Sequence, residues 1–141
     1  FTDIGKPCEH VVRHFQQCHA AFLEANYDED LLIKGSYPWP LKNRIRGDRG
    51  HMSNDQAMDL FVRHRPDHMT HLFLSHLSRD NNSPKIVKNT FARIAGNTEI
   101  VIASRDRETR LYHIRNFAGR NIPIKNQARP LLHQVQLGLF Q

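Results

Sequence analysis

Cysteine, long hydrophobic runs and, near the C-terminus, acidic residues are scarce in this sequence of 141 residues. The two cysteines, Cys8 and Cys18, form no CxxC pair, which argues against a disulfide framework and favours a reducing compartment. No apolar run approaches the length of a transmembrane helix, and no segment resembles a signal peptide. We therefore expect a cytoplasmic protein without a membrane partner.

The lack of acidic residues is confined to the segment after Glu108. This segment accounts for five of the six excess positive charges of the chain, through Arg110, Arg115, Arg120, Lys125 and Arg129. A basic segment beside a nearly neutral body is typical of a protein that binds nucleic acid. A solvated, loosely ordered tail explains the charge equally well.

The body of the chain alternates strand and helix patterns, and its length suits one domain. Apolar runs predict the end of a strand that enters a Gly turn within residues 1–5, and strands at residues 19–25, 71–76, 99–104 and 111–115. Helices are expected in between, with a capping box at Ser53 and Gln56 and with Ser83 and Pro84 starting the last one. The pattern predicts an α/β fold. Its helices are few for so apolar a sheet, so either another chain supplies the missing cover or the chain is incomplete.

Polar residues follow three of these strands: Asp3, the segment 24–28 and His76. In open α/β sheets, functional residues gather at the carboxyl ends of strands. An aspartate and a histidine brought together there would suit zinc or manganese. Taken singly, Asp3 could be a turn residue, and His76 could be an ordinary hydrogen-bonded histidine.

Four segments in this order carry a resemblance to a known family: "FTDIG", "FLEANYDEDLL", "GHMSNDQA" and "LFLSHLSRDNNSP". Residues 1–115 resemble the C-terminal half of a metallo-β-lactamase-fold hydrolase, most closely the bacterial single-domain nuclease branch of the YycJ/WalJ type. The resemblance implies half of an αββα sandwich, with a dinuclear metal centre at the edge of the two sheets. Residues 116–141 then form an irregular basic tail.

The resemblance also implies roles for single residues. Asp3 matches the bridging carboxylate and His76 the last histidine ligand of two divalent ions, zinc or manganese. His51 matches a histidine beside the metals that assists the leaving group.

Two further segments match the family near this centre. Glu24, Asn26 and Asp28 correspond to a segment that surrounds the metal site, although Ala25 and Tyr27 replace the usual Ser and His. The segment after His76 is expected near the substrate phosphate or at a helix start, and it contains Arg79, Asn81 and Asn82.

One family motif does not occur in the sequence. HxHxDH, which supplies most of the metal ligands and belongs to the N-terminal half, is missing, as is a further histidine that follows it. The chain also begins within what the pattern predicts to be a strand, which suggests a fragment, a processed chain or an incomplete form. We therefore expect the N-terminal half of the same enzyme as a partner, and we expect this chain alone to be inactive.

The leading hypothesis is part of a metal-dependent phosphodiesterase that acts on DNA, and the sequence leaves exonuclease and endonuclease action open. One alternative is a metallo-hydrolase of a small ester, thioester or lactam. Another is a half-domain that binds without catalysis. The basic tail favours nucleic acid over the small substrates.

The C-terminus contains the sequence QLGLF. It resembles the pentapeptide by which bacterial polymerases and repair proteins dock on the DNA sliding clamp, with anchors at Gln136, Leu137, Leu139 and Phe140. Docking would recruit the enzyme to replication or repair sites. Alternatively, these apolar residues pack on the core of their own chain.

Overall fold

A computed structural model of the chain describes residues 1–114, which form a parallel three-stranded sheet and five helices. The sheet has the order β1-β2-β3, and its register aligns Phe22, Phe73 and Val101 across the strands. This architecture confirms the α/β class. In chain order the elements are α1 (Glu9–Phe15), β1 (Ala20–Glu24), α2 (Glu29–Lys34), α3 (Trp39–Arg46), α4 (Asn54–His64), β2 (His71–Ser75), α5 (Pro84–Phe91) and β3 (Glu99–Ile102).

Residues 1–5 form no regular strand, and the expected strand end is found at Phe1 alone, which pairs with β1. Its amino group donates to the Phe22 carbonyl at 2.8 Å, and its own carbonyl accepts from the Glu24 amide at 2.9 Å. Two residues later, Asp3 has a φ of 57°. That left-handed conformation cannot belong to a strand, so the extended backbone ends there.

The expected strand at residues 111–115 is wrong over its described part, because residues 111–114 form no strand. Instead, the Tyr112 ring packs edge-on against Phe73, with ring centroids 5.1 Å apart. The Arg110 guanidinium pairs with Glu99 at 2.6 Å, which holds this segment beside β3. The segment lies over the sheet and does not extend it.

The expected helix starts are confirmed for the two helices that pack most closely together. The Ser53 hydroxyl accepts from the Gln56 amide at 3.2 Å, and the Gln56 side chain accepts from the Ser53 amide at 2.8 Å, completing the capping box of α4. Ser83 caps α5 in the same way through the Ile86 amide. Each cap stabilises its helix by about 1 kcal/mol.

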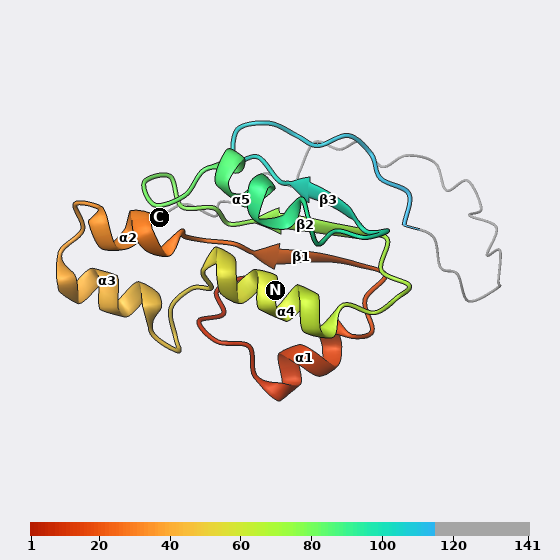
Figure 1. Cartoon of the computed structure of the whole chain (residues 1–141), viewed down its shortest axis with the longest axis horizontal. Coiled ribbons are helices and arrows are strands. Elements are labelled where there is room, and N and C mark those ends of the chain that lie inside the picture. Colours follow the sequence, from red (N-terminus) through yellow and green to blue (C-terminus); the bar gives the residue numbers. More distant parts are fainter. Residues whose placement is uncertain (115–141) are drawn as a thin grey trace, which may run out of the picture.

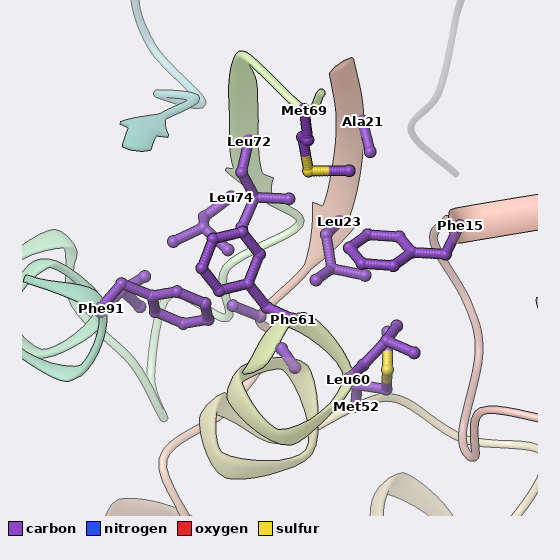
Figure 2. Close-up of a cluster of buried hydrophobic side chains, with 13 residues drawn as sticks. Phe15, Ala21, Leu23, Met52, Leu60, Phe61, Met69, Leu72, Leu74 and Phe91 are labelled. Carbon is purple, nitrogen blue, oxygen red and sulfur yellow. The ribbon is translucent and has the colours of Figure 1, made fainter. Parts of the chain in front are cut away.

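One face of the sheet carries the helices and the core. Leu23, Leu72 and Leu74 are fully buried there. Figure 2 shows Phe91 and Phe15 pointing from opposite sides towards Phe61 and Leu23 respectively. Phe61 and Phe91 come from α4 and α5, so these two helices close the core over β2.

The opposite face is less covered. Phe22 stacks on Phe73 at a centroid distance of 4.6 Å, yet 53% of Phe22 is exposed. Among the described residues, Tyr112 is the aromatic that packs on Phe73 from outside the strands. The apolar sheet therefore has one face covered by helices and a second face that is exposed at Phe22 and buried at Phe73 and Val101.

The carboxyl ends of the three strands point towards α2 and α3 (Figure 1). None of the described helices has the length and hydrophobicity of a membrane-spanning segment. The carboxyl edge of the sheet is where the polar residues of interest meet.

Candidate metal centre and adjoining cleft

Three potential metal ligands converge at the carboxyl edge of the sheet. Asp3 follows Phe1 along the edge of β1, His76 directly follows β2, and His51 lies in the loop between α3 and α4. One ligand atom from each lies within 4.8 Å of the others. The structure thus brings together the two expected metal ligands and the expected catalytic histidine, from three segments far apart in sequence.

Glu24, the last residue of β1, is fully buried and contacts both histidines of this cluster. Its Oε1 lies 2.7 Å from His51 Nδ1 and 2.8 Å from His76 Nδ1. A carboxylate can only accept, so each Nδ1 carries the proton that it donates, and each Nε2 of the neutral rings keeps its lone pair. Glu24 therefore sets the tautomer in which both histidines can bind a metal through Nε2.

The backbone of the cluster is strained at two points. Asp3 and His76, with φ values of 57° and 58°, are the two non-glycine residues with positive φ in the described part of the chain. Such a conformation costs on the order of 1–3 kcal/mol and persists where the surrounding structure enforces it, often at functional sites. Both residues are those expected to hold metal.

Asn26 enforces the conformation at His76. Its side-chain amide donates to the His76 carbonyl at 2.8 Å, and its own carbonyl accepts from the Ser78 amide at 2.7 Å. The Ile4 amide donates to Glu24 Oε2 at 3.1 Å and so anchors the segment that carries Asp3. Asn26 and Glu24 thus position the backbone that presents the ligands.

Asp28 has a different task from its neighbours. Its carboxylate accepts from the Leu31 amide at 3.0 Å and caps α2, so it belongs to the helix and not to the cluster. Tyr27, where the resemblance described above would place a histidine, is buried, and burial raises its pKa to about 12. A phenol held protonated in the interior is a poor substitute for a metal-binding imidazole.

Asn81 and Asn82 lie in the interior at the start of α5, one of the two places expected for them. The Asn82 side chain accepts from the Ser83 amide at 2.9 Å and donates to the Ala25 carbonyl at 2.7 Å. It also exchanges two hydrogen bonds with the Asn54 side chain. Asn81 is 2% exposed, and its amide donates to the Ser78 hydroxyl.

The donor set of the cluster fits a divalent transition metal. One carboxylate and two imidazoles, with the rings oriented by a buried carboxylate, are ligands that zinc and manganese accept. Of these three residues, Asp3 and His76 are the expected ligands, and His51 lies beside them. Two ions would need donors beyond those of this cluster.

A cleft of about 690 Å³ adjoins the cluster, and Asp3 and His51 form part of its wall. Four arginines line it: Arg44, Arg49, Arg79 and Arg105. Sequence reasoning had identified Arg79 alone. The basic run at residues 44–49 was a signal for two of the others, although charge alone does not distinguish a cleft wall from a solvated surface.

Tyr37 and Asp80 close one part of this cleft. The Tyr37 hydroxyl donates to Asp80 Oδ2 at 2.7 Å, and this hydrogen bond raises the pKa of Tyr37 above its ordinary value. The bond ties the segment between α2 and α3 to the loop after β2. The cleft wall is thereby linked to the loop that carries His76.

Comparison with known proteins finds curated relatives with nuclease names. The chain is 33% identical to exodeoxyribonuclease WalJ of Streptococcus pneumoniae serotype 2 (strain D39) over 89 residues, which cover 63% of this chain and 33% of the relative. It is equally similar to WalJ of Streptococcus pneumoniae strain ATCC BAA-255 / R6. It is 31% identical to exodeoxyribonuclease YycJ of Bacillus anthracis over 93 residues, or 66% of this chain and 35% of the relative.

No protein-family model and no solved structure matches the chain. The chain spans about a third of the length of the curated relatives that it matches. It is therefore similar to part of the exodeoxyribonucleases of the WalJ and YycJ type.

Proposed function

We propose that this chain is part of a metal-dependent phosphodiesterase of the metallo-β-lactamase superfamily that degrades DNA as an exonuclease. The observation that carries the proposal is the convergence of Asp3, His51 and His76 on the buried carboxylate of Glu24. The similarity to proteins named exodeoxyribonuclease supports the reaction class.

The residues of the cluster have separate tasks in this proposal. Asp3 and His76 hold the metal ions, and Glu24 keeps the His76 ring in its binding tautomer. Bound divalent ions would activate water and stabilise the charge that develops on the phosphoryl oxygens. His51 lines the cleft, and in its protonated form it gives the Nε2 proton to the leaving oxygen, while Glu24 stabilises the imidazolium.

A second half of the enzyme is part of the proposal. The HxHxDH motif is absent from this sequence, and the cluster holds too few donors for two ions. We propose that the N-terminal half of the same enzyme supplies the remaining ligands and covers the open sheet face around Phe22. The chain together with that half is called the complete enzyme below.

The alternatives differ in the substrate that they require. A small ester, thioester or lactam offers little negative charge to a cleft lined by four arginines, so the cleft favours a phosphodiester polymer. A half-domain that only binds would not need two histidines held in one tautomer by a buried carboxylate.

Recruitment by a sliding clamp stays a proposal of its own. The QLGLF segment, with Gln136, Leu137, Leu139 and Phe140, lies outside the described residues, as does the whole basic tail at 116–141. A tethered docking peptide would raise the local concentration of the enzyme on DNA at replication or repair sites in the cytoplasm.

Nuclease assays on the complete enzyme test the proposed function. We expect degradation of DNA that requires manganese or zinc and that chelation abolishes, whereas this chain alone should be inactive. Asp3→Asn should abolish the activity, and Asp67→Asn, an equal charge change at an exposed site beyond the amino end of β2, should preserve it. Metal-independent degradation would refute the mechanism, and robust turnover by this chain alone would refute the need for a second half.

A further inference from the structure

The arginines of the cleft come from three separate segments. Arg44 belongs to α3 and Arg49 to the loop that follows it, whereas Arg79 lies in the loop after β2 and Arg105 follows β3. All four side chains are exposed. The fold therefore brings arginines from segments that are distant in sequence to the walls of one cleft.

The donors of these arginines are available to a ligand. Within residues 1–114, the guanidinium groups of Arg44, Arg49 and Arg79 have no acidic residue at ion-pair distance. The fourth, Arg105, donates to the Leu77 carbonyl at 2.9 Å and is thereby held in place.

Other arginines of the chain are already engaged. Arg46, between two cleft arginines in sequence, pairs with Glu29 at 3.2 Å. Arg65 donates to the carbonyls of Ile94 and Ala95. The contrast indicates that the cleft arginines form no ion pairs within the described residues.

The acidic groups in the cleft do not cancel this charge. Asp3 and Asp80 are the two acidic residues that line the cleft, against four arginines, and Asp3 also belongs to the metal cluster. The cleft thus has four guanidinium groups and two carboxylates, and one of these carboxylates, Asp3, is a proposed metal ligand. The remaining positive charge suits an anion that has several oxygens in a row.

The size of the cleft decides between one phosphate and several. Its volume of about 690 Å³ falls within the range of roughly 300–1,000 Å³ of sites that bury whole organic ligands, well beyond a single phosphate. Guanidinium groups bind phosphate oxygens in pairs of parallel hydrogen bonds, so each arginine can hold one phosphate.

We propose that this cleft binds the backbone phosphates that flank the scissile phosphate in a nucleic-acid strand. This inference rests on the proposed function and names what the same site recognises: a run of phosphates and not an isolated phosphodiester. Arg44, Arg49 and Arg79 neutralise the flanking phosphates, while the metal cluster takes the bond to be cleaved. The strand then lies along α3 and the loop after β2.

Two substrates separate this role from the chemistry of the cluster. A single-stranded oligonucleotide has flanking phosphates, whereas bis(4-nitrophenyl) phosphate is a phosphodiester without any. In the complete enzyme, Arg44→Gln, Arg49→Gln and Arg79→Gln should each lower kcat/KM for the oligonucleotide about tenfold more than for the small diester. Arg13→Gln on α1, also exposed and outside the cleft, is the matched control and should lower neither.

The salt dependence of binding gives a readout that a structural defect would not reproduce. Fluorescence anisotropy of a labelled oligonucleotide, measured without divalent metal, gives the slope of log K against log salt concentration. Each cleft substitution should reduce the slope by about 0.7, because one fewer phosphate is neutralised. Arg13→Gln should leave the slope as it is.

The outcomes distinguish this inference from the proposed function. Equal losses on both substrates, or an unchanged salt slope in all three variants, would overturn the phosphate-binding cleft. If the parent enzyme cleaves neither substrate, the proposed function fails, and the slope still decides the cleft: a reduced slope supports it and an unchanged slope overturns it.

Discussion

Two groups of polar side chains lie at the same edge of the sheet, one buried and one reaching the surface around the buried Glu24, and they differ in how completely they are paired. The Asn54 and Asn82 side chains bond to each other twice, at 3.1 and 2.8 Å, and Asn82 also bonds to the backbone of Ala25 and Ser83. The group around Glu24 is paired on one side only. Within the described residues, Nε2 of His51 and of His76 has no hydrogen-bond partner, although Nδ1 of both rings has one.

This difference separates a role in the fold from a role in chemistry. A buried polar group whose donors and acceptors are all paired specifies how segments pack, and it offers nothing to a ligand. A group that is held rigidly on one side and unpaired on the other is prepared for a ligand. The strained backbone at Asp3 and His76 lies in the second group alone.

The largest effect is expected from removing a metal ligand. In the complete enzyme, Asp3→Ala and His76→Ala should each lower metal affinity and activity. The loss should exceed the factor of about 10–100 that is typical when a residue that orients a metal ligand is removed. The free energy of unfolding of the metal-free protein should change little in Asp3→Ala, because the side chain is 68% exposed and alanine keeps the same positive φ. His76→Ala also loses the hydrogen bond to Glu24 and should lower the free energy of unfolding by about 1 kcal/mol.

Metal content by elemental analysis and unfolding by denaturant, measured on the same samples, check this prediction. Asp67→Ala serves as the control for a lost surface carboxylate. A variant that keeps its full metal content would show that the residue is not a ligand.

The next largest effect concerns His51. If it donates a proton to the leaving group, His51→Ala should retain metal and lower the single-turnover rate by about 10²–10⁴-fold. A more acidic leaving group should raise the cleavage rate of the variant more than that of the parent enzyme. The reason is that the variant must expel the leaving oxygen unprotonated.

The geometry makes this prediction sharp, because the rings of His51 and His76 lie side by side and both hydrogen-bond through Nδ1 to Glu24 Oε1, at 2.7 and 2.8 Å. Loss of metal in His51→Ala would therefore reassign His51 from proton donor to ligand.

The sequence predicted where the strands end better than it predicted the contacts of the polar residues at those ends. Apolar runs located β1, β2 and β3, and the carboxyl-end rule placed Asp3 and His76 together. It could not show that Glu24 binds two histidines, because that depends on the loop between α3 and α4 folding back over β1.

Other features had weaker signals in the sequence. The apolar residues at 111–114 suggested a strand, yet an apolar run does not distinguish pairing with a sheet from packing on its face. The cap formed by Asp28 could have been predicted, since an aspartate before "EDLLIK" is a common helix start. The position of the arginines in one cleft could not be predicted from the sequence, because exposed charged residues follow no periodic pattern.

The smallest effect on chemistry, and the clearest on stability, is expected for the fully paired group. Asn82→Ala should lower the free energy of unfolding by about 1–3 kcal/mol, because Asn54 and the Ala25 carbonyl lose buried partners. The double variant Asn54→Ala/Asn82→Ala should cost less than the sum of the two single changes, since the second change removes a group already left unpaired.

Denaturant unfolding of the four proteins in this cycle measures the coupling, with Asn89→Ala on the exposed side of α5 as the control. Metal content should be the same in all of them, because neither asparagine contacts the cluster. Additive losses would show that the two asparagines do not act as a pair. Loss of metal at unchanged stability would overturn the contrast between the two groups, because a fully paired interior network would then be controlling the ligands.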